Sequence, residues 1–370
     1  MHLLKDASLF VPESMGKKDL LIGFGKILGI YDEAMPSDFA AFDVETVDCL
    51  GKTIVPGFFD THVHITGGGG EGGYTTRIRE GKKEEFVNVG TTSVIGVLGT
   101  DCFSRSLKNL LAKTRELNEL GMNAFMTTGS YKYPPVTITG ELMDDVILVP
   151  EIIGSGEFAV SDHRGSGISA QELKRICLDT HVGGMVSKKS GKVIVHMGEA
   201  KPGMKILREV IEEGVVPVTQ MIPTHMSRCD KLLEEGKEWV KKYGGYMDLT
   251  AKVRTAEIIC ELVEEDVDLK KITVTSDGLG SWPVFNENGE VISTTASPVD
   301  TLLKTFKKLV TEFNMSVDKA LLPFTRNPAT FFDVTDKGIG VIKTGGYADF
   351  IVFDEEFNIE NVYLKSEKMM

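Results

Sequence analysis

Apolar runs alternate with amphipathic stretches through the middle of the chain, and this alternation limits the folds that the chain can adopt. The amphipathic stretches have the 3.6-residue periodicity and charged face of surface helices, as in residues 103–120, 169–181, 205–213 and 231–242. The apolar, strand-like runs are residues 53–59, 92–98, 124–128, 152–160, 193–197, 215–223, 246–251 and 272–276. Eight strands alternating with helices over about 280 residues predict a (β/α)8 TIM barrel.

An open, doubly wound α/β sheet is the competing interpretation of this alternation. Such a sheet is expected to carry Gly-x-Gly-x-x-Gly directly after its first strand, where the backbone approaches a dinucleotide. No such pattern follows the first run, and the glycines at residues 67–70 come after two histidines without opening a helix. We therefore favour the barrel and expect these glycines to form a loop.

Both ends of the chain differ from the middle, because they contain short strand-like runs punctuated by Gly or Pro and no long helix. These runs are residues 7–11, 20–23, 26–31, 42–49, 346–353 and 361–364. We expect the termini to pair into one small, discontinuous, β-sandwich-like domain made of residues 1–54 and 336–370, with the barrel at residues 55–335.

Charge and cysteine usage exclude several classes of partner. The 370 residues carry a net charge of −13 and no basic patch, which argues against nucleic acid. The five cysteines are scattered and odd in number, which favours reduced thiols over a disulfide framework. Because neither a signal peptide nor an apolar run of membrane-spanning length is present, we expect a soluble cytoplasmic protein without a membrane partner.

His62 and His64 stand one residue apart at the end of the first apolar run. Side chains at positions i and i+2 of a strand point to the same side, so both imidazoles can approach one metal ion. His-x-His alone is a weak signal of metal binding, and the remaining strand ends decide its meaning.

Further metal-ligating residue types occur at the ends of other runs, where barrel enzymes place their chemistry. The fourth run contains Glu157, the fifth ends in His196, the sixth ends in His225, and Asp277 follows the eighth. Four of the seven histidines thus lie at strand ends. The alternatives are polar histidines of the core or rim, and a helix N-cap role for Asp277.

Imidazole and carboxylate ligands suit zinc, and also manganese, nickel or cobalt. Six protein ligands exceed the needs of one catalytic zinc, which takes three and keeps a place for water. We therefore expect two divalent metal ions, most readily zinc, sharing a bridging carboxylate. The expected ligands are His62, His64, Glu157, His196, His225 and Asp277.

Several segments resemble a known family. Residues 56–64 (PGFFDTHVH) resemble the first-strand signature of the amidohydrolase superfamily, and residues 346–352 (GYADFIV) resemble its C-terminal sheet motif. Within that superfamily the chain resembles the isoaspartyl (β-aspartyl) dipeptidases. The segments that carry this likeness are 64–71 (HITGGGGE), 98–101 (LGTD), 137–140 (TITG), 161–164 (SDHR) and 223–225 (PTH).

One position departs from the family pattern. Members of this family commonly carry a lysine whose carboxylated side chain bridges the metals, and the aligned residue here is Glu157. The glutamate carboxylate stands roughly 4 Å closer to its backbone than a carboxylated lysine would. Our hypothesis is that Glu157 bridges the two metals without carbon dioxide-dependent modification.

The resemblance also implies residues that contact the substrate. Glu71 is expected to bind the α-ammonium group and to assist proton movement, and Tyr131 to stabilise the oxyanion. Arg164 and Arg228 are expected to grip substrate carboxylates. The alternatives are a solvated loop charge, a tyrosine packed on the rim and surface ion pairs. Weaker candidates are Thr100 and Ser281 as hydrogen-bonding groups and Gly69 through its backbone.

These residues together predict a metallo-dipeptidase that cleaves β-aspartyl dipeptides by attack of a metal-bound hydroxide, with Asp277 as proton shuttle. The resemblance further implies a homo-oligomer. One alternative is another amidohydrolase, such as an N-acyl-amino-acid deacylase or a cyclic-amide hydrolase. The other is a non-catalytic scaffold on the same fold.

Overall fold

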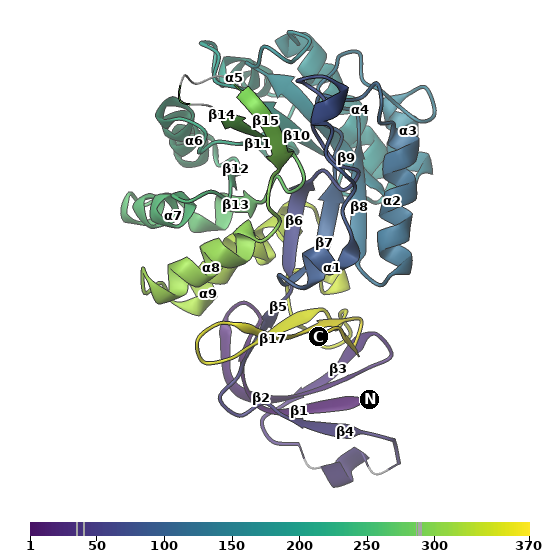
Figure 1. Cartoon of the computed structure of the whole chain (residues 1–370), viewed down its shortest axis with the longest axis vertical. Coiled ribbons are helices and arrows are strands. Elements are labelled where there is room, and N and C mark those ends of the chain that lie inside the picture. The colour runs from purple at the N-terminus through teal and green to yellow at the C-terminus, as the bar shows by residue number, and fades with distance from the viewer. Residues whose placement is uncertain (35, 40, 286, 288–290) are drawn as a thin grey trace.

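The chain divides into a β-rich end that holds both termini and a larger α/β part (Figure 1). The computed structural model describes residues 1–34, 36–39, 41–285, 287 and 291–370. The first and last segments of the sequence therefore lie side by side, whereas the middle of the chain forms the α/β part.

The α/β part is built on a curled parallel sheet. Six strands pair in chain order: β6 (Phe58–Val63), β7 (Thr91–Gly96), β8 (Asn123–Thr128), β9 (Ile152–Val160), β10 (Lys192–Met197) and β11 (Met221–Thr224). Two more parallel strands follow, β12 (Met247–Thr250) and β13 (Ile272–Thr275). The last of these strands meets the first, because Val63 in β6 forms a parallel bridge with Gly278, just after β13.

Helices on the outer side connect most of these strands (Figure 1). They are α1 (Lys83–Val87), α2 (Leu107–Glu119), α3 (Leu142–Leu148), α4 (Ala170–Ser187), α5 (Lys205–Glu212), α6 (Asp230–Tyr243), α7 (Thr255–Glu264), α8 (Thr301–Thr311), α9 (Val317–Leu321) and α10 (Arg326–Phe331). Short 3-10 turns are η1 (Pro36–Phe39), η2 (Tyr74–Thr76), η3 (Val218–Gln220), η4 (Leu269–Lys271), η5 (Leu322–Phe324) and η6 (Thr335–Lys337).

Local sequence explains several helix ends. The Ser106 side chain accepts a hydrogen bond from the Asn109 amide, so α2 begins later than the predicted residue 103. Ser169 and Glu172 form a reciprocal capping box at the start of α4. Helix α6 ends at Gly244, whose φ of 71° is readily adopted without a Cβ atom.

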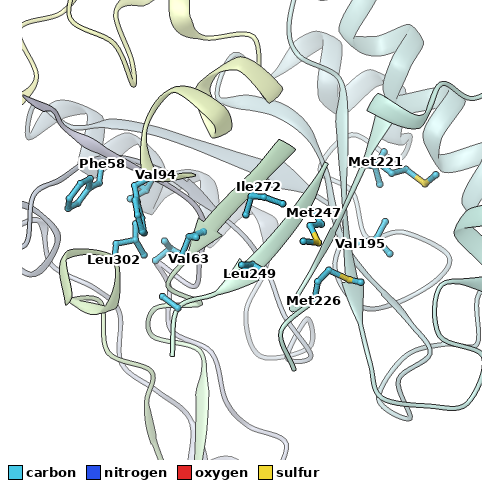
Figure 2. Packing of buried hydrophobic residues seen from close by; sticks show 14 of the residues in the cluster. Phe58, Val63, Val94, Val195, Met221, Met226, Met247, Leu249, Ile272 and Leu302 are labelled. Atoms are coloured by element: carbon cyan, nitrogen blue, oxygen red, sulfur yellow. The ribbon is translucent and has the colours of Figure 1, made fainter. Parts of the chain in front are cut away.

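Buried aliphatic and sulfur-containing side chains fill the space around the strands. Figure 2 shows Val195, Met226, Met247 and Leu249 in this core; Val195 lies in β10, and Met247 and Leu249 lie in β12. Phe58 packs against the aromatic ring of Phe306, with centroids 5.7 Å apart. Removal of these apolar surfaces from water is the main term that stabilises the strand frame.

The terminal segments form an eight-stranded sheet of their own. Its strands are β1 (His2–Phe10), β2 (Ser14–Gly23), β3 (Lys26–Tyr31), β4 (Glu45–Asp48), β5 (Thr53–Pro56), β16 (Phe350–Phe353), β17 (Ile359–Leu364) and β18 (Glu367–Lys368). Strand β5 pairs in parallel with β1 and antiparallel with β16, which joins the two ends of the chain.

The first predicted run, residues 53–59, is split between the two sheets. Residues up to Pro56 belong to β5 of the terminal sheet, and β6 starts at Phe58. Gly57 lies at the joint, where a Cβ atom would come within 2.2 Å of Thr92 Oγ1. Apolar periodicity is continuous across this glycine, so sequence pattern alone does not locate the crossing.

Two other expectations differ from the structure. Only the end of the predicted run 215–223 is a strand, because η3 precedes β11. An antiparallel hairpin of β14 (Ser281–Phe285) and β15 (Val291–Ala296) was not predicted. Within the described ranges, no helix combines the length and apolar character needed to cross a membrane.

Candidate metal centre and substrate pocket

His62 and His64 lie together at the carboxyl end of β6, and both side chains are buried. Their ring centroids are 5.7 Å apart. The Asp60 carboxylate accepts hydrogen bonds from the amides of His62 and Ser276, while the His64 amide donates to the Gly278 carbonyl. The end of β6 is thus fixed to the chain that follows β13.

Glu157 in β9 is fully buried among four imidazoles. Its Oε2 lies 2.6 Å from His62 Nε2, 3.6 Å from His196 Nδ1 and 3.8 Å from His225 Nε2, and its Oε1 lies 3.9 Å from His64 Nε2. Burial alone would raise the pKa of Glu157, but the charge of His62 and polar contacts with His196, His225 and His62 hold that pKa well below its ordinary value. The side chain is therefore a charged carboxylate.

Asp277 completes the cluster from the segment after β13. Its Oδ1 lies 3.2 Å from His64 Nε2 and 3.7 Å from His62 Nε2. Asp277 adopts a left-handed φ of 51° and His225 one of 65°, a conformation uncommon outside glycine and often found at functional sites. Burial would raise the pKa of Asp277, but the hydrogen bond from His64 and the charges of the neighbouring histidines hold it below the ordinary value.

The donor set fits divalent metal ions. Buried polar atoms almost always have hydrogen-bonding partners, because an unpaired one costs about 1–3 kcal/mol. Among the described residues, both Glu157 oxygens, both His62 nitrogens and His64 Nδ1 are buried without a partner of acceptable geometry. Two sets of three residues each have ligand atoms that all lie within 4.8 Å of one another. One set is His62, His64 and Asp277, and the other is His62, Glu157 and His225.

His225 and His196 receive hydrogen bonds or contacts that orient their rings. His225 Nδ1 lies 2.6 Å from Thr250 Oγ1, which leaves Nε2 facing Glu157. His196 Nδ1 lies 2.6 Å from the Tyr131 hydroxyl. Its Nε2 lies 2.9 Å from a carboxylate oxygen of Asp162, a residue to which the sequence analysis gave no role.

A cavity opens beside this cluster. All seven predicted substrate residues line it, and so do three of the six predicted metal ligands, whereas His62, Glu157 and His225 do not. The predicted residues in its wall are His64, Gly69, Glu71, Thr100, Tyr131, Arg164, His196, Arg228, Asp277 and Ser281.

At one side of the cavity, the Glu71 carboxylate is held by hydroxyl groups. Ser281 Oγ lies 2.9 and 2.8 Å from its two oxygens, and Thr100 Oγ1 lies 3.3 Å from Oε1. Arg164 Nη1 is 3.6 Å from the same carboxylate. The predicted Glu71, Thr100 and Ser281 are therefore brought together, and Arg164 lies within reach.

The glycine loop of residues 67–70 needs its glycines. Gly67 and Gly69 both have a φ of 79°. A Cβ atom on Gly67 would lie 2.2 Å from the Ile78 carbonyl oxygen, and one on Gly69 would lie 2.3 Å from that of Thr76. Only glycine combines this backbone conformation with so close an approach of two chain segments.

Arg105 and Asp101 also line the cavity and were not predicted. The buried Arg105 guanidinium donates to the carbonyl oxygens of Thr66 and Ile78 and to the Asp101 carboxylate. Asp101 belongs to the segment LGTD that carried the family resemblance. Arg105 has no motif signal, because its role depends on two carbonyl groups that are distant in sequence.

The remaining histidines and the cysteines lie outside the ligand cluster. The His163 side chain is 91% exposed, His181 Nδ1 contacts Gln220, and His2 Nδ1 lies 3.3 Å from Glu45. His163 Nδ1 lies 3.6 Å from an oxygen of Asp162. All five cysteines are free thiols, as expected.

Comparison with known proteins defines the class of this fold and site. The model of the amidohydrolase family matches residues 53–369, and the chain belongs to that family. Within it, the chain is 41% identical to the crystallised beta-aspartyl dipeptidase of Fervidobacterium islandicum AW-1 in complex with beta-Asp-Leu. That alignment covers 100% of this chain and 96% of the other, with a TM-score of 0.92. The predicted membership of the isoaspartyl dipeptidase group is thereby confirmed.

More distant relatives share the fold. A curated dihydroorotase of Caldanaerobacter subterraneus subsp. tengcongensis is 23% identical over 401 residues, covering 95% of this chain and 87% of that protein. The structure of N-acetylglucosamine-6-phosphate deacetylase from Pasteurella multocida is 16% identical with a TM-score of 0.69, covering 100% of this chain and 99% of that one. These levels of identity support the architecture and leave the substrate to the residues of the site.

Proposed function

We propose that this protein is a metal-dependent hydrolase of β-aspartyl dipeptides. The observation that carries the proposal is a buried His/Glu/Asp donor set beside a cavity whose wall includes the Glu71 carboxylate and the guanidinium groups of Arg164 and Arg228. The similarity to a beta-aspartyl dipeptidase over the whole chain supports the same substrate class.

The proposed metal ligands are those at the strand ends: His62, His64, Glu157, His196, His225 and Asp277. They would hold two divalent ions, with zinc as the first choice and manganese, nickel or cobalt as alternatives. Glu157 would bridge them, because its Oε1 faces His64 and its Oε2 faces the other three histidines. When bound, such ions lower the pKa of water and polarise a carbonyl group.

Asp277 and Tyr131 are the proposed groups for proton movement and charge stabilisation. Asp277 lies between the ligand cluster and the cavity, with 24% of its side chain exposed, so it can take a proton and return it to the departing amine. The Tyr131 hydroxyl points into the same cavity wall beside His196 and can donate to the developing oxyanion.

Each charged group of the dipeptide is proposed to bind side chains of the opposite charge. Glu71, supported by Thr100 and Ser281, would accept hydrogen bonds from the α-ammonium group and assist proton movement. Arg164 and Arg228 would bind carboxylate through planar guanidinium forks. Backbone groups at Gly69 complete the contact. This spacing of charges favours a dipeptide with free termini over a neutral amide.

At the level of fold, we propose that the eight parallel strands form a complete (β/α)8 barrel, residues 55–335. The terminal sheet would then be a small β-sandwich-like domain of residues 1–54 and 336–370. The return of β13 to β6 supports the barrel, and the pairing of β5 with β16 supports the discontinuous domain. A cytoplasmic location and a homo-oligomeric state stay predictions.

A panel of related substrates tests the assignment. The zinc-loaded protein should cleave β-Asp-Leu and should lose at least about tenfold in kcat/KM on N-acetyl-β-Asp-Leu, which lacks the ammonium group that Glu71 would bind. Dihydroorotate is included because a dihydroorotase is among the relatives. Turnover of dihydroorotate without turnover of β-Asp-Leu would replace the proposal by a cyclic-amide hydrolase.

A further inference from the structure

Asp162 joins the ligand cluster to the arginine pair. It follows β9 directly, and its side chain is only 4% exposed. Oδ1 accepts from Arg164 Nε at 3.0 Å and Oδ2 from Arg164 Nη2 at 2.7 Å, which is a bidentate pair. The same Oδ2 lies 2.9 Å from His196 Nε2 and 3.6 Å from Arg228 Nη1.

The contact with His196 identifies which ring nitrogen carries the hydrogen. Beside two guanidinium groups Asp162 is a carboxylate, and a carboxylate only accepts hydrogen bonds. Arg164 Nη2 and Arg228 Nη1 also lie 3.3 and 3.2 Å from His196 Nε2, but the Asp162 oxygen is nearer, at 2.9 Å, and both guanidinium groups face the Asp162 carboxylate. We therefore assign the hydrogen between Asp162 and His196 to Nε2. The lone pair is then on Nδ1, the nitrogen that lies 2.6 Å from the Tyr131 hydroxyl and 3.6 Å from Glu157 Oε2.

We propose that Asp162 is a positioning residue that couples metal binding to substrate binding. Through His196 it fixes the tautomer in which Nδ1 is available to a metal ion. Through Arg164 it fixes the direction of the guanidinium fork that faces the cavity. The role through Arg164 rests on the proposed function, because it assigns Arg164 to a substrate carboxylate. The role through His196 concerns metal binding alone.

Removal of the negative charge of Asp162 is expected to weaken metal binding and substrate binding by different routes. An amide at position 162 can present an N–H group to His196, which favours the tautomer with hydrogen on Nδ1 and blocks that nitrogen as a ligand. It also deprives Arg164 of its bidentate acceptor. Substitution of a group that orients a metal-ligating histidine typically weakens metal binding about 10- to 100-fold.

Zinc affinity and substrate KM of Asp162→Asn test the proposal in the full-length protein. Competition with a chromophoric chelator, with zinc as the only added ligand, should show a zinc Kd raised at least about tenfold. At saturating zinc, the KM for β-Asp-Leu should also rise at least about tenfold, as expected for a lost charge-assisted hydrogen bond. The matched control is His163→Asn, which replaces an exposed neighbour of Asp162 and should leave both quantities unchanged.

Asp162→Glu separates positioning from packing. It keeps the charge but shifts the carboxylate by one methylene group, so it should recover part of the zinc affinity that Asp162→Asn loses. If Asp162→Asn does not fold, the same zinc titration is carried out with Asp162→Glu and Asp162→Ser. The serine variant should then bind zinc more weakly than the glutamate variant. Folded variants that keep the wild-type zinc Kd would overturn the proposal. Failure of the wild type to cleave β-Asp-Leu would remove the proposed function and leave the zinc titration intact.

Discussion

The two carboxylate oxygens of Glu157 point toward imidazole nitrogens and have no hydrogen-bonding partner of acceptable geometry within the described part of the chain. A fully buried carboxylate is unfavourable unless positive charge compensates it. The neighbouring histidines supply part of this charge, and bound divalent ions would supply more. The buried carboxylate is therefore compatible with a site for divalent metal ions.

Substitution of this carboxylate by an amide should weaken metal binding. In Glu157→Gln we expect fewer than two zinc ions per chain and a loss of about a thousandfold in kcat for β-Asp-Leu, equal to several kcal/mol of barrier. Elemental analysis and initial rates measure the two effects. Glu151→Gln is the matched control, since Glu151 precedes the same strand at its opposite end and pairs with Arg115. Two tightly bound zinc ions in Glu157→Gln would contradict the bridging role.

Glu71 gives the second prediction at this scale. In Glu71→Gln the KM for β-Asp-Leu should rise about 10- to 100-fold with a smaller change in kcat, because a charge-assisted hydrogen bond is worth about 1.5–3 kcal/mol. Steady-state kinetics separate the two parameters. The exposed Glu84→Gln should behave as the wild type. An unchanged KM in Glu71→Gln would assign the ammonium group to another residue.

Sequence reasoning located the candidate ligands because strand ends of a parallel sheet meet at one rim. It did not identify Asp162 or Arg105, whose roles depend on partners from other strands and loops. Asp162 belonged to the quoted segment SDHR, so its adjacency to Arg164 was a usable signal. The bond from Asp162 to His196 spans 34 residues and is fixed by three-dimensional packing.

Among the elements, the glycine loop after β6 is the one whose backbone shapes the cavity most directly. Gly67 combines a φ of 79° with an approach to the Ile78 carbonyl that leaves no room for a Cβ atom. Gly73 in the same segment also has a positive φ, of 99°, but no atom lies within 4 Å of the position of its Cβ. Comparison of the two glycines therefore distinguishes the effect of a close backbone neighbour from the effect of a positive φ alone.

Substitution by alanine tests this difference. Both variants lose about 1–3 kcal/mol of stability, because each glycine has a positive φ that alanine adopts only with strain. Only Gly67→Ala must also displace the backbone near residues 78 and 79, so its kcat/KM for β-Asp-Leu should fall at least about tenfold. Gly73→Ala should stay within about threefold of the wild type. Equal kinetic effects in both variants would show that the close approach is unimportant.

The order of elements was predicted better than their boundaries. Alternating apolar and amphipathic stretches indicated the parallel strands and the outer helices, because burial of one helix face and of whole strands leaves a periodic signal. The division at Gly57 was missed, since strands of two different sheets follow one another within a single apolar run. The hairpin of β14 and β15 was missed as well, because no strand-like run was identified between residues 276 and 346.

On the scale of the whole molecule, Asp349 connects the terminal sheet with the parallel sheet. One carboxylate oxygen accepts from Asn123 Nδ2 at 2.6 Å, and the other accepts from the Lys365 amide at 2.6 Å. The Gly57 amide donates to the Asp349 carbonyl oxygen at 3.1 Å. A single buried residue thereby contacts both sheets and the joint between them.

The buried position of Asp349 predicts a pH dependence of stability. Burial raises the pKa of Asp349 above its ordinary value of 3.8, so the folded state binds the proton more tightly than the unfolded state. The stabilising contribution is therefore present at low pH and is lost as the pH rises through the raised folded pKa. The unfolding free energy of the wild type relative to Asp349→Asn should decrease over that range.

Urea unfolding of both proteins in chelator, at a series of pH values, measures this difference. Asp354→Asn is a suitable control, because its carboxylate lies on the surface of the same terminal sheet and its pKa is lowered by Asn358. If the difference in unfolding free energy between the wild type and Asp349→Asn is constant with pH, Asp349 has the same proton affinity in the folded and unfolded states. That result would contradict the prediction.

Zinc titration of the metal-free protein, followed by hydrolysis of β-Asp-Leu and α-Asp-Leu, tests the central claim most directly. The account predicts that β-Asp-Leu cleavage rises until two zinc ions are bound per chain, while α-Asp-Leu stays uncleaved. Saturation at one ion, or equal cleavage of both isomers, would contradict it.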